Sequence, residues 1–322
     1  MSISLLPLRK ASLKDPEQFP TGSLSPHRAR CLGVLSSLVK AMPELPEVEI
    51  TARLIGAATA GVGIESALAP GINALRTFDP PLASIQGRRI TGIDRRGKLF
   101  LVELEDELTL LIHLMSAGRL QLFDKRASLR DRASRLLVRL DDGRELRLRE
   151  FGTKQAAWVK LVTPEGLASE ETLAKLGPEA YPDPPPLGPL LDAPRPLHGL
   201  LRDQRVLAGI GRSWVDEILH AAQLSPFKRG AELSDEEAVG LRDAIVARLG
   251  EAIEYYEQHL ALPIPDKLPM PLAVHRRNGE PCPRCGDRLE AVFYEEYVMC
   301  YCPTCQTDGK LLKDRRLSRL LK

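Results

Sequence analysis

The chain has 322 residues, of which 43% are hydrophobic and 27% are charged, a composition typical of a globular protein with two or three domains. No apolar run is long enough to span a bilayer, so we expect no membrane partner. The formal net charge is +2, and residues 1–41 and 306–322 each hold six basic and two acidic side chains, which leaves −6 for residues 42–305. This excludes a uniformly basic surface, so any nucleic-acid function must depend on particular residues and on the basic tail.

Residues 1–41 show no clear hydrophobic periodicity and are rich in Ser, Pro, Leu and Arg. The run CLGVLSSLV resembles the apolar part of a signal peptide, but a polar lead-in of about thirty residues is too long for one. We expect this segment to be an unstructured extension or a mis-assigned start.

Residues 42–165 are predicted to form a β-sandwich or barrel domain that begins with a helix at about 46–60. Short apolar or alternating runs follow the helix, and Arg-Gly and Asp-Gly turns separate them, as expected for strands joined by hairpins. These runs are RRITGIDRRGKLFLVEL, LTLLIHLM, SRLLVRLDDGRELRLREF and AAWVKLV.

A proline-rich segment and a change of period predict a second, helical domain. The stretch YPDPPPLGPLLDAPRP has seven prolines in sixteen residues, so 166–197 is predicted to be a stiff linker. Within 198–265 the sequence has a helical period, and Ser234 with Glu237 has the spacing of a capping box. The predicted helices are LHGLLRDQRVLAGIG, SWVDEILHAAQL and SDEEAVGLRDAIVARLGEAIEYYEQHL.

Two C-x2-C pairs near the C-terminus, Cys282–Cys285 and Cys302–Cys305, are separated by sixteen residues. This spacing predicts four thiolates around one structural zinc ion at the ends of a hairpin, with no open position for water. The alternatives are two disulfides or a redox pair, but neither a secretory context nor a βαβ pattern supports them.

Cys300 would share a strand face with Cys302, which makes it a rival ligand. We expect a zinc finger at 266–306, after a second proline-rich stretch, and a basic tail at 307–322.

The stretch AMPELPEVEI, which ends at Ile50, allows two interpretations. It fits an ordinary helix start, because proline suits the first turn and the carboxylates of Glu44 and Glu47 complement the positive end of the helix dipole. It also fits a mature N-terminus whose first residue, Pro43, performs chemistry.

Four motifs in order resemble the formamidopyrimidine-DNA glycosylase/endonuclease VIII family over about residues 42–306: MPELPEVEI, RRGKLFLVEL, DQRVLAGIGRSWVDEIL and NGEPCPRCG…YCPTCQ. The resemblance implies an α+β multidomain fold, with an N-terminal β-sandwich and leading helix, a helix-two-turn-helix domain and a zinc-finger hairpin. It implies a base-excision-repair DNA glycosylase with AP-lyase activity, whose partner is double-stranded DNA containing damaged bases or abasic sites. We expect a monomer in the cytoplasm, associated with the nucleoid.

In this family the mature N-terminal proline is the nucleophile, and Pro43 matches it. A free α-amine has a pKa of about 7.7–8, so at neutral pH it would attack the sugar C1′, displace the base and leave an iminium ion that permits β- and then δ-elimination. Glu44 matches the catalytic acid and Glu47 a second acid. Lys98 matches a lysine that contacts phosphate, although taken alone it reads as a solvated hairpin residue.

The resemblance also implies side chains that fill the gap left when the damaged nucleotide is extruded. Met115 in HLMSAGRL, and Arg149 and Phe151 in LREFG, match this set, although Met115 is one residue out of register. Singly, Met115 and Phe151 read as core residues.

Three positions depart from the family pattern. Glu150 replaces an arginine and would place a like charge opposite phosphate. Arg212 replaces an asparagine at the helix turn, where it would still hold a phosphate bidentately. Tyr297 replaces the fingertip arginine, where it would stack on a base, and the basic tail would supply the lost contacts unless it is only a solvated helix.

Two alternatives remain open besides the active enzyme: a damaged-DNA-binding protein that has lost the chemistry, and an unrelated zinc-ribbon module. The ordered match disfavours the second. In a chain that starts at Met1, the nitrogen of Pro43 is a tertiary amide and cannot attack a sugar, which favours a start at Met42. The short proline-rich segment before the finger favours a substrate other than 8-oxoguanine.

Overall fold

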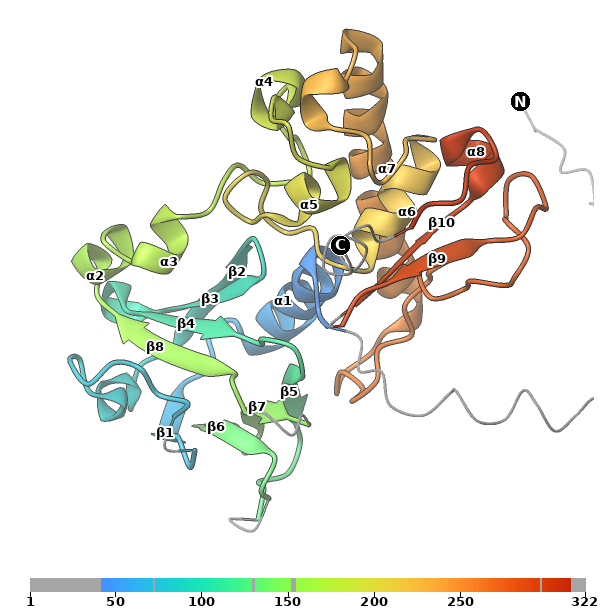
Figure 1. Ribbon diagram of the computed structural model, residues 1–322. Coiled ribbons are helices and arrows are strands. Elements are labelled where there is room, and N and C mark those ends of the chain that lie inside the picture. Colours follow the sequence, from blue (N-terminus) through green and yellow to red (C-terminus); the bar gives the residue numbers. More distant parts are fainter. Residues whose placement is uncertain (1–41, 72, 129–130, 152–154, 296, 314–322) are drawn as a thin grey trace, which may run out of the picture. The chain divides into compact units, whose positions relative to one another are not determined.

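The computed structural model describes residues 42–71, 73–128, 131–151, 155–295 and 297–313, all of which belong to the unit Lys40–Lys322 (Figure 1). The predictions for residues 1–41 and for most of the basic tail lie outside the described residues. Among the described helices, none is long and apolar enough to cross a membrane.

The first domain begins with a helix and continues as two antiparallel sheets. The helix is α1 (Leu45–Thr59), one residue from its predicted position. One sheet has the order β2-β3-β4-β8 and the other β1-β6-β7-β5. The strands are β1 (Ile64–Leu68), β2 (Ile90–Arg96), β3 (Leu99–Leu104), β4 (Thr109–His113), β5 (Gly118–Phe123), β6 (Ser134–Leu140), β7 (Glu145–Glu150) and β8 (Trp158–Val162). Two short 3-10 helices, η1 (Leu82–Ile85) and η2 (Glu105–Glu107), connect them.

Apolar side chains from both sheets fill the space between them, as the alternating runs predict. This core includes Phe100, Ile112, Leu136 and Leu148, which are fully buried. The predicted β-sandwich with a leading helix is therefore confirmed.

After the sandwich, the described residues form seven α-helices and one 3-10 helix. The elements are α2 (Pro164–Ala168), α3 (Glu171–Ala174), α4 (Leu187–Leu191), α5 (Leu197–Arg202), α6 (Trp214–Ala221), η3 (Gly230–Glu232), α7 (Asp235–His259) and α8 (Pro303–Thr307), the last of which lies beside the cysteines. The capping box of Ser234 and Glu237 is present at the start of α7.

The first predicted helix of this region ends early, at Arg202. The reason is the following turn, where Asp203 Oδ1 accepts a hydrogen bond from the backbone N–H of Arg205. The side chain of Gln204 then donates to the carbonyl of Ile210 at 2.7 Å and accepts from the N–H of Gly209 at 2.9 Å. These contacts replace the next helical turn with an ordered loop that leads into α6.

The proline-rich stretch packs as part of the helical core. Leu187 and Leu191 of α4 are buried in the same cluster as Tyr256 of α7. The backbone of Gly230 lies directly against this helix, because a Cβ at that position would be 1.8 Å from the carbonyl oxygen of Leu191.

The C-terminal elements form the predicted hairpin, β9 (Glu290–Phe293) paired with β10 (Val298–Tyr301). Helix α8 follows it directly (Figure 1).

Gly230→Ala tests the packing of α4. We expect it to lower the free energy of unfolding by about 1–3 kcal/mol, as overpacking against a fixed backbone does. Gly188→Ala in α4 is the matched control, since nothing lies within 4 Å of its Cβ; it should be neutral or stabilising. Equal stability of the two variants in denaturant titrations would contradict this packing.

Candidate active site and metal centre

The carboxylate of Glu44, just before α1, lies at the N-terminus of α6. It accepts hydrogen bonds from the backbone N–H groups of Gly211 at 2.6 Å, Ser213 at 2.8 Å and Trp214 at 3.3 Å. The N-terminus of a helix presents unpaired N–H groups and the positive end of the dipole, so it is a natural place for an anion. Pro43 is buried beside Glu44, and the structure thus places the predicted nucleophile next to this bonded carboxylate.

Two glycines allow the start of α1 to lie this close to the N-terminus of α6. A Cβ at Gly211 would lie 2.3 Å from Cδ of Glu44. Gly209 has φ +110, which an L side chain rarely adopts, and its carbonyl accepts the N–H of Leu45 at 3.0 Å. The GIG motif therefore serves to seat the start of α1.

Glu47 is buried one turn further along α1 and is bonded on both oxygens. Oε2 accepts the N–H of Glu44 at 2.8 Å, and Oε1 accepts from Trp214 Nε1 at 3.1 Å and from the Tyr256 hydroxyl at 2.7 Å. Burial, followed by the negative charge of Glu44, raises the pKa of Glu47 to about 7. Glu47 is therefore a carboxyl group that exchanges its proton near neutral pH.

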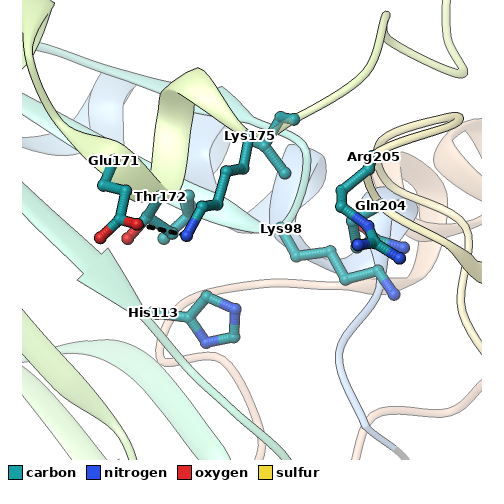
Figure 2. Close-up of a pocket in the computed structure, with 9 residues that line it drawn as sticks. Lys98, His113, Glu171, Thr172, Lys175, Gln204 and Arg205 are labelled. Atoms are coloured by element: carbon teal, nitrogen blue, oxygen red, sulfur yellow. Dashed lines mark hydrogen bonds and ion pairs between the residues drawn. The ribbon is translucent and has the colours of Figure 1, made fainter.

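Lys98 follows the β2–β3 turn, as predicted, and lines a cavity of about 310 Å³. Burial lowers its pKa, the positive charges of Arg202 and Arg212 lower it further, and Glu44 and Glu47 oppose the shift. Figure 2 shows the Lys98 side chain extending toward Gln204 and Arg205, away from His113. The lining residues are Lys98, Leu99, His113, Glu171, Thr172, Lys175, Leu176, Gln204 and Arg205.

His113 lines the same cavity and was not found from the sequence, although it lies two residues before Met115. Its Nδ1 accepts the N–H of Met115 at 2.9 Å, and its ring stacks on Trp158. Burial, then the charges of Lys98 and Arg76, lowers its pKa to about 4. The imidazole is therefore neutral with its proton on Nε2, which makes it a donor for a ligand oxygen.

The three residues predicted to fill the extruded-base gap lie in two groups. Arg149 and Phe151 lie together, with the guanidinium 4.8 Å from the ring centroid, and Arg149 also pairs with Asp131 at 3.3 Å and Asp266 at 3.2 Å. Met115 has φ +51 and packs against the cluster of Leu99, Leu111 and Trp158.

The expectation that Glu150 faces phosphate is wrong. Its side chain is buried, and Oε1 accepts the N–H groups of Ala156 at 2.9 Å and Ala157 at 3.1 Å. Arg135 Nε lies 3.8 Å from Oε2. Because successive strand residues point to opposite faces, Glu150 turns inward between Arg149 and Phe151, where it anchors the chain leading into β8.

Arg212 and Tyr297, both predicted to contact DNA, lie close together in the structure. The guanidinium carbon of Arg212 is 5.5 Å from the Tyr297 ring centroid, and that of Arg202, which the sequence did not reveal, is 4.2 Å from it. The ring stacks with Tyr294 at 4.5 Å and His198 at 5.7 Å. In the sequence Arg202 lies within the predicted helix LHGLLRDQRVLAGIG as an ordinary basic residue, so nothing indicated this contact.

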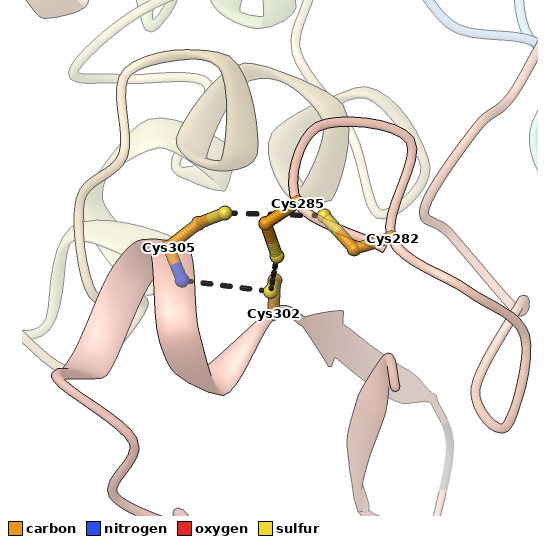
Figure 3. Close-up of side chains that lie close together, drawn as sticks. All are labelled: Cys282, Cys285, Cys302 and Cys305. Atoms are coloured by element: carbon orange, nitrogen blue, oxygen red, sulfur yellow. Dashed lines mark hydrogen bonds between the residues drawn. The ribbon is translucent and has the colours of Figure 1, made fainter. Parts of the chain in front are cut away.

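The four predicted metal ligands come together where the loop that holds Cys282 and Cys285 meets the start of α8 (Figure 3). Their sulfur atoms all lie within 4.8 Å of one another, with Cys282 and Cys305 at 3.9 Å and Cys285 and Cys302 at 3.5 Å. These separations are too long for disulfides and match the edges of about 3.8 Å in a tetrahedron with Zn–S bonds of about 2.3 Å. The donor set therefore fits zinc.

Cys300 lies outside this group. Its sulfur accepts the N–H of Arg276 at 3.1 Å, and burial, then the charge of Asp216, raises its pKa to about 12. It is a core thiol beside the site and does not compete as a ligand.

The pKa of Glu47 predicts how stability changes with pH. An unfolded-state pKa of 4.5 and a folded-state value of about 7 mean that the folded protein retains the proton longer. The contribution of Glu47 to the free energy of unfolding is present in full below pH 4.5 and is lost as pH rises to about 7. At 1.36 kcal/mol per pKa unit, the total loss is about 3 kcal/mol. Urea titrations from pH 5 to 8 should show this decline in the wild type but not in Glu47→Gln. If the unfolding free energy changes equally with pH in both proteins, the raised pKa does not belong to Glu47.

Comparisons with known proteins agree with this architecture. The family model described as the formamidopyrimidine-DNA glycosylase N-terminal domain matches residues 42–153, and that of the H2TH domain matches residues 190–262. A formamidopyrimidine-DNA glycosylase from Thermus thermophilus is 34% identical, over 83% of this chain and 100% of the relative. One from Moorella thermoacetica is 36% identical, over 78% and 94%.

Solved structures show the same likeness. A Lactococcus lactis Fpg (MutM) bound to DNA containing N7-benzyl-Fapy-dG aligns with a TM-score of 0.74 at 27% identity, covering 82% of this chain and 100% of that one. The Thermus thermophilus MutM structure aligns with a TM-score of 0.70 at 32% identity, covering 83% and 100%. The chain belongs to the formamidopyrimidine-DNA glycosylase family of DNA-repair enzymes.

Proposed function

We propose that this protein is a base-excision-repair DNA glycosylase that also cuts the abasic strand, with Pro43 as its nucleophile. One observation carries the proposal: Pro43 and Glu44 lie at the N-terminus of α6, with the cation Lys98 electrostatically coupled to Glu44. An amine, a carboxylate and a phosphate-binding cation are the groups that this reaction needs.

The reaction would proceed through a covalent intermediate. The secondary amine of Pro43 attacks C1′ of the sugar, the N-glycosidic bond breaks, and the base leaves with a proton. The C1′–O4′ bond of the sugar ring then breaks, O4′ takes up a proton, and the nitrogen lone pair forms an iminium with C1′. The iminium withdraws electrons, so loss of a C2′ proton expels the 3′-phosphate, and a second elimination expels the 5′-phosphate. Water then releases the sugar fragment and restores the amine.

Each acid has a role in these proton transfers. The Glu44 carboxylate is fixed by three backbone donors next to the attacking nitrogen, where it would open the sugar ring and move protons during elimination. Glu47, with a pKa of about 7, would act as a second proton store. Lys98 and the neutral His113 would hold backbone phosphate in the cavity they line.

The DNA would be held open by the group around Arg149 and Phe151. Phe151 is half-buried beside the guanidinium, and a similar wedge between base pairs offsets part of the cost of unstacking. Arg149 would exchange Asp131 and Asp266 for DNA. We propose oxidised bases and abasic sites as substrates, acted on by a monomer in the cytoplasm, at the nucleoid. Several structural relatives are Fpg complexes with DNA, including one with an abasic site.

A second candidate function is damaged-DNA binding without chemistry. It is favoured by the Met42–Pro43 peptide bond, which leaves the proline nitrogen without a hydrogen or a free lone pair. The glycosylase reaction requires a form of the protein in which Pro43 is the first residue. Whether the Met42–Pro43 peptide bond is present therefore decides between the two functions.

Borohydride trapping separates these functions. A chain that starts at Met42 and has lost that methionine should form a covalent adduct with abasic-site DNA, because borohydride reduces the iminium to a stable amine. The intact 1–322 chain is the matched control and should form none. Trapping by the intact chain would show that a lysine is the nucleophile and that Pro43 is not. Binding without an adduct by the shortened chain would favour the second function.

The cysteine site predicts one structural zinc per chain. The wild type should contain about one zinc by elemental analysis, and Cys282→Ser should lose the metal and much of its DNA affinity together, because metal binding and folding of the finger are coupled. Cys300→Ser is the matched control, since this thiol lies outside the four-sulfur group, and it should keep the metal. A metal-free wild type with full DNA binding would contradict the zinc assignment.

A further inference from the structure

Arg202, the last residue of α5, belongs to a cluster of three cations beside the proposed site. Arg202 and Arg212 are close enough to Lys98 that both positive charges lower its pKa, after the larger effect of burial. Both guanidinium groups also contact the Tyr297 ring, at 4.2 and 5.5 Å from its centroid. Three like charges are therefore held in one small region that joins β2–β3, α5 and the loop before α6.

Glu44 and Glu47, the two carboxylates whose charges act on Lys98, are bonded to other groups or partly protonated. The oxygens of Glu44 are directed to three backbone N–H groups, and Glu47, with a pKa of about 7, is partly protonated at neutral pH. Among the residues that the structure describes, no carboxylate forms an ion pair with Arg202. A group of gathered cations of this kind attracts an anion from solution.

The Arg202 guanidinium packs against the face of the Tyr297 ring. The ring is half-buried and is stacked with Tyr294 and with His198, at interplanar angles of 21° and 14°. His198 is buried, with Nε2 3.3 Å from Asp216 Oδ1. The Tyr297 ring is thus stacked on a buried histidine that is itself paired with a buried carboxylate. A guanidinium that contacts an aromatic face keeps its N–H edge available for a bidentate bond to phosphate.

We propose that Arg202 is a further phosphate-binding residue of this protein and that Tyr297 is the positioning residue that orients it. The anion is a backbone phosphate of the bound DNA strand, next to the abasic sugar that reacts at Pro43. This inference rests on the proposed function, because it assumes that DNA enters the site beside Lys98. It assigns the fingertip tyrosine a role through its contact with an arginine of α5.

The test is equilibrium binding of the 1–322 chain to a duplex with a tetrahydrofuran abasic analogue, which needs no chemistry. Arg202→Gln should weaken binding about tenfold, as expected for a lost hydrogen bond to a charged group. It should also reduce the log–log salt slope by about 0.9, the value for one phosphate contact. Arg202→Lys keeps the charge and should keep the slope while it loses part of the affinity.

The tyrosine variants separate positioning from a structural effect. Tyr297→Phe keeps the ring face and should bind like the wild type, whereas Tyr297→Leu should weaken binding in the same direction as Arg202→Gln. Arg126→Gln is the charge-matched control, because Arg126 forms an exposed pair with Glu65 and such pairs contribute little; it should bind like the wild type.

The outcomes are distinct. Wild-type affinity and slope in Arg202→Gln would overturn the inference and leave the proposed function standing. Equal weakening by Tyr297→Phe and Tyr297→Leu would overturn the positioning role. Failure of both the 1–322 chain and the chain that begins at Pro43 to bind the abasic duplex would overturn both the inference and the proposed function.

Discussion

The bond between the Glu44 carboxylate and the N-terminus of α6 joins the two halves of the described structure. It fixes the first residues of α1 at the start of α6 in the other domain. The approach is so close that the residue at position 211 has no room for a Cβ and must be glycine. Helix α1 contributes side chains to both hydrophobic cores. Leu45 and Ile50 pack with the helical domain, and Val48 and Ile55 pack with the sandwich. The position of Pro43 thus depends on the packing of both domains, because the residue after it is held by one and the helix it precedes is embedded in both.

Much of this arrangement could be predicted because local patterns carry it. Alternating apolar runs specify strands whichever partners they have, and the spacing of the four cysteines specifies a metal site before any fold is known. The capping box at Ser234 is equally local. The domain boundaries between these elements stay predictions, and the buried leucines of α4 show why a run of prolines does not by itself define a linker.

What the sequence could not reveal are contacts between residues far apart in the chain. Glu150 was expected to face phosphate because it stands where the family has an arginine, but strand alternation and the N–H groups of Ala156 and Ala157 turn it inward. The pKa of Glu47 is raised by burial and then by the charge of Glu44, although hydrogen bonds from the distant Tyr256 and Trp214 oppose the shift. Arg202 is recognised as a candidate binding residue only through its contact with Tyr297, ninety-five positions later in the chain. In each case the physical cause is burial or a partner that no local pattern specifies.

The central claim is that the nitrogen of Pro43 forms the covalent bond to the sugar. Peptide mapping by mass spectrometry of the borohydride-reduced adduct tests it most directly. We expect the deoxyribose-derived mass on a peptide that begins with Pro43, attached to its α-nitrogen. The same mass on the side chain of Lys98, or on any other lysine, would contradict the account.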